Sequence, residues 1–93
     1  LSPSGDDGVN IDMLNGSDIA NANFDGNTIQ ANGVHGVDFN IDNSDLGPVA
    51  FTENVISDQG TGDGVSVVSP TDTNNALDFT FARNTIANNG NAT

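Results

Sequence analysis

The chain repeats one short phrase three times: "FDGNTI" at 24–29, "FTENVI" at 51–56 and "FARNTI" at 81–86. Each copy reads Phe, two variable residues, Asn, one variable residue and Ile, and the copies start 27 and 30 residues apart. A second phrase, Gly-Val followed by alternating apolar residues, begins at positions 8, 36 and 64, at spacings of 28. Two interleaved phrases that share a period of about 28 residues indicate an internal repeat.

Both phrases have the residue pattern of β-strands. After the second Gly-Val start, the apolar residues Val37, Phe39 and Ile41 alternate with polar ones, and this period of two is typical of half-buried strands. Stretches rich in Asn, Asp, Gly, Ser and Pro separate the strands, as expected for turns. No segment has the i, i+3, i+4, i+7 pattern of an amphipathic helix. The sequence therefore predicts an all-β chain, a single domain over 1–93 with coils at about 8–35, 36–63 and 64–93.

The Asn of the repeated phrase is assigned a structural role. Phe24 and Ile29 are five positions apart, an odd number, so both can point inward only if the backbone bends between them. Asn27 is predicted at that bend because Asn tolerates the left-handed backbone conformation. Coils stacked about 4.7–4.9 Å apart let such amides hydrogen-bond in a ladder. The predicted ladder is Asn27, Asn54 and Asn84, and the predicted core around it is Phe24, Phe51, Phe81, Ile29, Ile56 and Ile86.

The phrase Phe-x-x-Asn-x-Ile, a polar turn and then Gly-Val with alternation together resemble the right-handed parallel β-helix repeat of the pectin-lyase-like superfamily. The resemblance covers residues 8–90 and implies a β-solenoid of about three coils of 27–30 residues. The handedness comes from the resemblance and not from the spacing. Because both ends of such a stack are open sheet edges, we expect either a slice of a longer solenoid or copies that stack head to tail.

The composition is acidic and rich in amides. The chain has 12 Asp, one Glu, 15 Asn, one Arg and no Lys, and its net charge is −12. Such a surface is not expected to bind nucleic acid or anionic membranes, since it offers no cationic footprint, and no apolar stretch is long enough for membrane insertion. The absence of Cys excludes a disulfide scaffold and a thiolate metal site. An acidic chain suits a salty or calcium-rich medium, so we expect an extracellular or cell-surface location.

Three acidic turns are candidate Ca²⁺ sites. The stretches "GDDG" at 5–8, "DNSD" at 42–45 and "DQGTGDG" at 58–64 gather carboxylates, amides and free carbonyls, the hard oxygen ligands that Ca²⁺ uses. The last stretch partly resembles the calcium-binding RTX nonapeptide, with its Asp one place early. The alternative interpretation is a diffuse acidic surface. The candidate ligands are Asp6, Asp7, Asp42, Asp45, Asp58 and Asp63.

A second set of residues resembles a catalytic site. Asp7, His35 and Asp63 each precede a Gly-Val and are predicted to share one column. The stretches "GDDGV" and "VHGV" resemble the carboxylate and Gly-His-Gly motifs of polygalacturonases, which implies acid–base roles on a glycosidic bond for Asp6, Asp7 and His35. The chain lacks the basic pair that holds the substrate in that family. Solvated turn residues ahead of a glycine are therefore the favoured interpretation.

Arg83 is open to a similar choice. Its position resembles that of the catalytic base in polysaccharide lyases of the superfamily. It also aligns with Glu53 one coil earlier, since both are the second residue after their Phe. An outward Glu53–Arg83 pair across neighbouring strands is the simpler interpretation.

The sequence favours a structural function over an enzymatic one. We expect an extracellular structural or adhesive β-solenoid module, the subunit of a filament that grows by self-association through the open ends. The alternative is a module that binds or cleaves acidic glycans. Anionic glycans would require Ca²⁺ bridging, since the protein carries almost no positive charge.

Overall fold

The computed structural model describes residues 5–69 and 78–90. Its regular structure is entirely β, which confirms the predicted class, and no described segment forms a helix that could cross a membrane. In chain order the described strands are β1 (Val9–Leu14), β2 (Asp18–Ile19), β3 (Ala22–Asp25), β4 (Thr28–Gln30), β5 (Val37–Asp42), β6 (Asp45–Leu46), β7 (Val49–Thr52), β8 (Val55–Ser57), β9 (Val65–Val68), β10 (Phe79–Ala82) and β11 (Thr85–Ala87).

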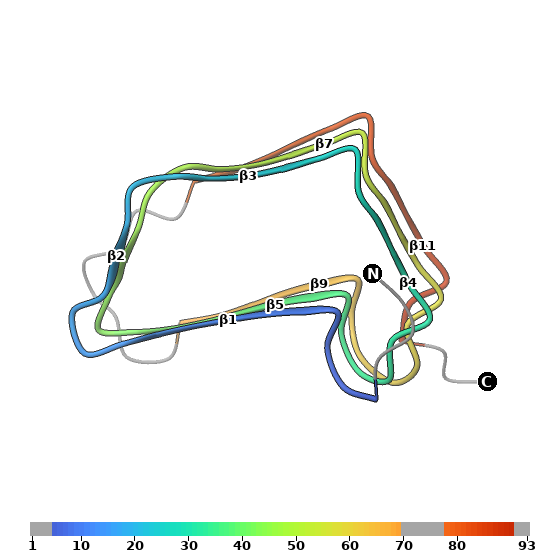
Figure 1. Cartoon of the computed structure of the whole chain (residues 1–93), viewed down its shortest axis with the longest axis horizontal. Helices are drawn as coiled ribbons and strands as arrows, with labels where there is room; N and C mark the ends of the chain where they lie inside the picture. The colour runs from blue at the N-terminus through green and yellow to red at the C-terminus, as the bar shows by residue number, and fades with distance from the viewer. Residues whose placement is uncertain (1–4, 70–77, 91–93) are drawn as a thin grey trace.

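The strands form four parallel sheets, ordered β1-β5-β9, β3-β7-β10, β4-β8-β11 and β2-β6. In Figure 1 the described strands run along a four-sided path, and equivalent strands of successive rounds lie over one another. We call residues 8–35, 36–63 and 64–90 the first, second and third layers. The register matches the repeated phrase residue for residue, pairing Phe24 with Phe51 and Phe51 with Phe81, and likewise Ile29, Ile56 and Ile86.

The core lies inside this path and is built from apolar columns. On β5, Val37, Phe39 and Ile41 are buried, as their alternation with polar residues predicts. Phe51 stacks between two rings, with its centroid 4.6 Å from that of Phe24 and 4.9 Å from that of Phe81. Phe39 meets Phe51 edge-on from the opposite sheet, at 6.5 Å. Both geometries are favourable for aromatic pairs. The Phe column, which is Phe24, Phe51 and Phe81, therefore connects all three layers and packs against the β1-β5-β9 sheet.

The predicted core is wrong in the third layer, where Phe81 and Ile86 are not buried. Phe51 and Ile56 in the second layer are fully buried, whereas Phe81 is 48% and Ile86 45% exposed. Phe24 in the first layer is half-buried, and Ile29 is buried. Phe81 and Ile86 point inward, yet their strands β10 and β11 have a described neighbour on one side only. Their other faces therefore stay open.

The bends of the path share one backbone conformation. Gly26, Glu53 and Arg83 have φ values of 67°, 55° and 56° and immediately precede the Asn of the repeated phrase. The prediction that the Asn itself takes the left-handed conformation is therefore wrong. The residue before the Asn makes the bend that lets both Phe and Ile point inward, and the Asn side chain can then also point inward. The same conformation recurs at the next bend, at Ala31, Asp58 and Asn88.

Candidate functional site

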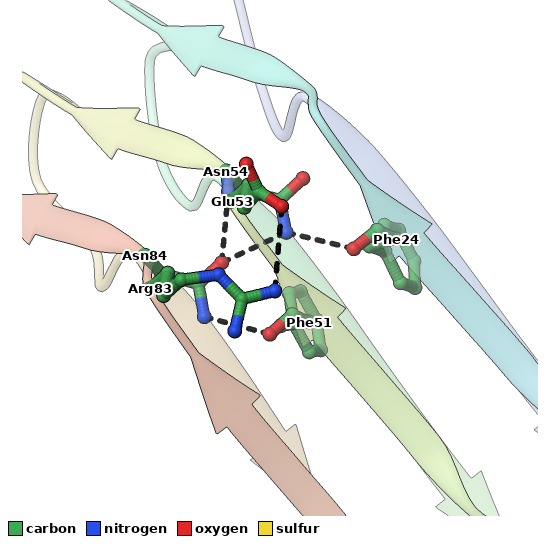
Figure 2. Close-up of polar contacts among 6 residues, drawn as sticks. All are labelled: Phe24, Phe51, Glu53, Asn54, Arg83 and Asn84. Atoms are coloured by element: carbon green, nitrogen blue, oxygen red, sulfur yellow. Dashed lines mark hydrogen bonds and ion pairs between the residues drawn. The ribbon is translucent and has the colours of Figure 1, made fainter.

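The first amide column consists of Asn27, Asn54 and Asn84 and joins the three layers at the bend after β3, β7 and β10. Figure 2 shows Asn54 and Asn84 of this column. Asn54 Oδ1 accepts hydrogen bonds from the Asn27 backbone N–H at 2.9 Å and from Asn27 Nδ2 at 3.0 Å. Asn84 Oδ1 accepts the equivalent pair from Asn54, also at 2.9 and 3.0 Å. The predicted ladder is thus present, and each rung binds the backbone of the preceding layer as well as its side chain.

The Asn54 and Asn84 amides of this column also reach back to a carbonyl. Asn54 Nδ2 donates to the Phe24 carbonyl at 2.8 Å, and Asn84 Nδ2 donates to the Phe51 carbonyl at 2.7 Å. Asn54 is only 1% exposed, and its side chain takes part in four hydrogen bonds. An apolar side chain there would remove all four bonds and leave the Asn27 N–H without its acceptor, which costs about 1–3 kcal/mol. The Asn of the repeat therefore forms hydrogen bonds with backbone groups at the bend and joins the layers.

A second amide column, which the sequence reasoning missed, lies one bend further along. The Asn32 N–H donates to Gln59 Oε1 at 3.0 Å, and the Gln59 N–H donates to Asn89 Oδ1 at 3.2 Å. Gln59 Nε2 donates to the Ile29 carbonyl at 2.9 Å and Asn89 Nδ2 to the Ile56 carbonyl at 3.0 Å. These three amides each follow the Ile of the repeated phrase by three positions. That spacing was a readable signal, hidden because Gln replaces Asn in the second layer.

The glycine of the Gly-Val phrase is explained by this second column. A Cβ on Gly36 would lie 2.5 Å from the Gly64 carbonyl oxygen, 2.7 Å from Ile56 Cγ2 and 3.3 Å from Gln59 Nε2. A Cβ on Gly64 would lie 2.7 Å from Asn89 Nδ2, and Gly8 stands in the same relation to Asn32, at 2.6 Å. The backbone passes over the buried amide at this point, so only glycine fits. The two repeated phrases are thus parts of one contact.

Asp7, His35 and Asp63 share a column, as their spacing predicts. The His35 N–H donates to Asp7 Oδ1 at 2.9 Å, and the Asp63 N–H donates to His35 Nδ1 at 2.8 Å. Asp6 lies beside Asp7 at an exposed position. In this column the Asp7 carboxylate and the His35 ring act as acceptors for the backbone of the following layer.

The acidic turns do not form a carboxylate cluster. In residues 5–69 and 78–90, no three His, Cys, Asp or Glu side chains lie close enough together to hold a metal ion. The candidate ligands instead lie at separate places: before β1 and β9 (Asp6, Asp7, Asp63), along β5 and β6 (Asp42, Asp45) and at the bend after β8 (Asp58). This distribution fits the diffuse acidic surface better than a carboxylate-rich Ca²⁺ site.

Arg83 and Glu53 form the outward ion pair that their alignment predicts. Arg83 Nη2 lies 3.3 Å from Glu53 Oε1, and the two side chains are 68% and 61% exposed (Figure 2). Exposed pairs of this kind contribute about 0.2–1 kcal/mol. Arg83 is therefore paired across neighbouring layers at the surface.

In the described part of the chain, few buried side-chain nitrogen and oxygen atoms lack a hydrogen-bond partner. They are Nδ2 and Oδ1 of Asn32 and Oδ1 of Asp38. The amides of Gln59 and Asn89 each find a carbonyl one layer earlier. No described residue offers Asn32 the equivalent carbonyl.

The chain was also compared with known proteins. No protein-family model matches it, and neither the curated proteins nor the solved structures contain a significant match. The likeness to the pectin-lyase-like superfamily therefore rests on the repeated phrases. Function is inferred below from the geometry of the columns.

Proposed function

We propose that the chain is a structural module, a right-handed parallel β-helix of three coils that serves as a building block of an extracellular or cell-surface protein or filament. The observation that carries this proposal is the pair of amide columns. They run through all three layers and satisfy backbone groups of one layer with side chains of the next. The buried amide side chains of these columns thus form hydrogen bonds that hold the layers together.

The arrangement of the strands supports the solenoid. Every sheet is parallel, and each strand pairs with the strand one period later in the sequence. The shortest dimension of the molecule is 18 Å. About three coils spaced 4.7–4.9 Å apart, with the turns that project beyond them, account for a stack of this height.

The roles of the polar side chains favour structure over chemistry. A general acid or base must reach the substrate and exchange a proton with it. Asn54 and Gln59 are buried at 1% and 0% exposure, and both bind backbone groups. The Asp7 carboxylate and the His35 ring bind backbone N–H groups of the following layer. All four side chains therefore act first as connections between layers.

A glycan-directed module is the second candidate, because the Asp7 carboxylate and His35 lie next to each other at one edge of the stack, where the His35 N–H donates to Asp7 Oδ1. Variants Asp7→Ala and His35→Ala, which remove both acceptors, separate the two functions. A structural role predicts lowered unfolding midpoints and no change in polygalacturonate turnover. Turnover by the wild-type chain that either substitution abolishes, with the midpoint preserved, would establish the glycan-directed function instead.

Mechanical unfolding tests the structural proposal directly. The chain would be pulled from its two ends by single-molecule force spectroscopy, beside the variant Asn54→Ala. A solenoid of 28-residue coils should lengthen in steps of about 95 Å, the contour of one coil at roughly 3.4 Å per residue, and the variant should yield at lower force. A chain that lengthens without measurable resistance is not a structural module.

A further inference from the structure

The third layer presents an open apolar face on the stack. Phe81 on β10 is 48% exposed and Val67 on β9 is 39% exposed, although both side chains point into the path, like Phe51 and Phe39 in the layer before. The equivalent second-layer residues are fully buried. Exposure at these positions thus comes from the lack of a following layer within the described residues. This face therefore carries apolar side chains of the kind that are buried in the second layer.

The first amide column gives the two ends of the stack opposite hydrogen-bonding character. Within the stack, the backbone N–H of each column Asn donates to Oδ1 of the Asn one layer later. The Asn84 N–H is the last such donor and finds no acceptor among the described residues. Asn27 Oδ1 is the first such acceptor, and no described donor reaches it. The third-layer end therefore has a backbone N–H donor, and the first-layer end has the amide oxygen that could accept from it.

We infer that the open face binds a second copy of this chain, with the third layer of one copy stacked on the first layer of the next. This inference rests on the proposed solenoid and names its partner. Strand β10 of one copy lies against β3 of the other, and β9 lies against β1. Phe81 stacks on Phe24 of the adjacent copy as it does on Phe51 within its own chain, where the centroids are 4.9 Å apart. The Asn84 N–H donates to Asn27 Oδ1 of that copy.

The hydrogen-bond pattern favours a second copy over an unrelated apolar partner. An unrelated partner would cover Phe81 but would not supply an amide oxygen one strand spacing from the Asn84 N–H. The first layer supplies both, because it carries the same phrase in the same register as the second layer. The contact joins two different faces and leaves one of each free, so it does not close on itself. Such head-to-tail contacts generate open filaments.

One corner of the first layer is already occupied, and this limits the interface. A Cβ on Gly33 would lie 2.4 Å from the Gly5 carbonyl, and Gly8 lies against Ile29 and Asn32. Gly60 and Gly90 lie over the layer before them in the same way as Gly33. The incoming copy therefore contacts the first layer along β1 and β3, and its chain beyond Ala87 must pass outside Gly5. The first amide column continues across the contact, and the second does not.

Two substitutions block the two faces separately. Phe81→Lys places a charge on the third-layer face, and Thr80→Lys is its matched control, because Thr80 projects outward from the same strand. Asn23→Pro blocks the first-layer edge. The Ala22 N–H donates to Pro48 of the second layer, so the neighbouring Asn23 N–H points away from that layer. Proline removes this outward donor without removing a bond inside the stack.

Sedimentation velocity of the 93-residue chain at physiological ionic strength, where charges are screened beyond about 8 Å, tests the inference. We expect the wild type and Thr80→Lys to form a concentration-dependent series of oligomers, and Phe81→Lys and Asn23→Pro each to remain monomeric. Mixing these two monomeric variants should give a 1:1 dimer, since each retains the face that the other lacks. A mixture without dimer, or oligomers of Phe81→Lys alone, overturns the inference.

Circular dichroism on the same samples separates this failure from failure of the proposed function. A chain with a cooperative β-sheet transition that stays monomeric at every concentration overturns the stacking and leaves the structural module in place. A chain without that transition overturns both.

Discussion

The second and third layers carry the same phrase, yet they bury it differently. Phe51 and Ile56 are fully buried, while Phe81 and Ile86 are 48% and 45% exposed. The strands are equally regular and the registers match residue for residue. The difference lies in the number of neighbours, because β7 and β8 have described partners on both sides, whereas β10 and β11 have one on one side only. In this fold, burial follows from position in the stack.

Truncating the stacked rings should give the largest contrast between the layers. Phe51→Ala removes a fully buried ring that stacks on two others, and such changes cost about 3–5 kcal/mol of unfolding free energy. Phe81→Ala removes a half-exposed ring with one stacking partner in the Phe column, so we expect less than half of that loss. Urea unfolding followed by circular dichroism measures both. Equal losses at dilute concentration would contradict the role assigned to the missing neighbour.

Adding one methyl group should separate the same layers again. In Gly36→Ala the new Cβ meets the Gly64 carbonyl of the following layer at 2.5 Å, as well as Ile56. Backbone cannot move aside, so we expect a loss of about 2–3 kcal/mol, as for other overpacked cores. In Gly64→Ala the Cβ meets only the side chains of Asn89 and Ile86, and both lie on the open layer and can shift. We expect that thermal unfolding will show a clearly smaller decrease in Tm for Gly64→Ala.

The amide column allows the comparison to be extended to the first layer. Asn54→Ala removes four side-chain hydrogen bonds and leaves the Asn27 N–H without its acceptor, so we expect a loss of about 2–3 kcal/mol. Asn27 is exposed, and Asn27→Ala removes only the bond from Nδ2 to Asn54. Its loss should stay near or below about 1 kcal/mol. Hydrogen exchange of the Asn27 backbone amide provides a second readout, since it should speed up in Asn54→Ala. Unchanged exchange there would show that Asn54 does not hold the first layer.

Much of this architecture could be predicted from the sequence because its signals repeat. Alternation gave the strands, the shared period gave the register, and the odd spacing from Phe24 to Ile29 located a bend and an inward Asn. The second amide column was also periodic. It was overlooked because the repeat alternates Asn and Gln, two residues with the same hydrogen-bonding groups and different lengths.

Other features could not be predicted from residue type. Glu53 and Arg83 occupy a backbone conformation that their side chains do not favour, so nothing in those two residues indicated that they, and not the adjacent Asn, form the bend. The exposure of Phe81 depends on which strands surround it, and a repeated phrase is the same in every layer. The Asp7–His35–Asp63 column was predicted from spacing, but its bonds to backbone N–H groups depend on local geometry.

The smallest predicted effect has the opposite sign and should not depend on the layer. Glu53 and Arg83 have φ values of 55° and 56°, and this conformation costs a non-glycine residue about 1–2 kcal/mol. The substitution Glu53→Gly relieves that cost, while it loses the exposed ion pair with Arg83 and makes the unfolded chain more flexible. We expect a net gain of about 0.5–1 kcal/mol in urea unfolding. Arg83→Gly should give a similar gain, because backbone strain at a bend is local and the same ion pair is lost.

The control for this prediction is Thr52→Gly, one residue earlier on β7, where the backbone is extended. That change should destabilise the protein, since glycine loses more conformational freedom on folding than Thr and there is no positive φ for it to relieve. If Glu53→Gly gained stability and Arg83→Gly did not, neighbours would influence the bends as they influence the core. Equal gains would separate the two properties of the repeat: burial depends on the number of layers stacked above and below, and the shape of each layer depends only on its own backbone.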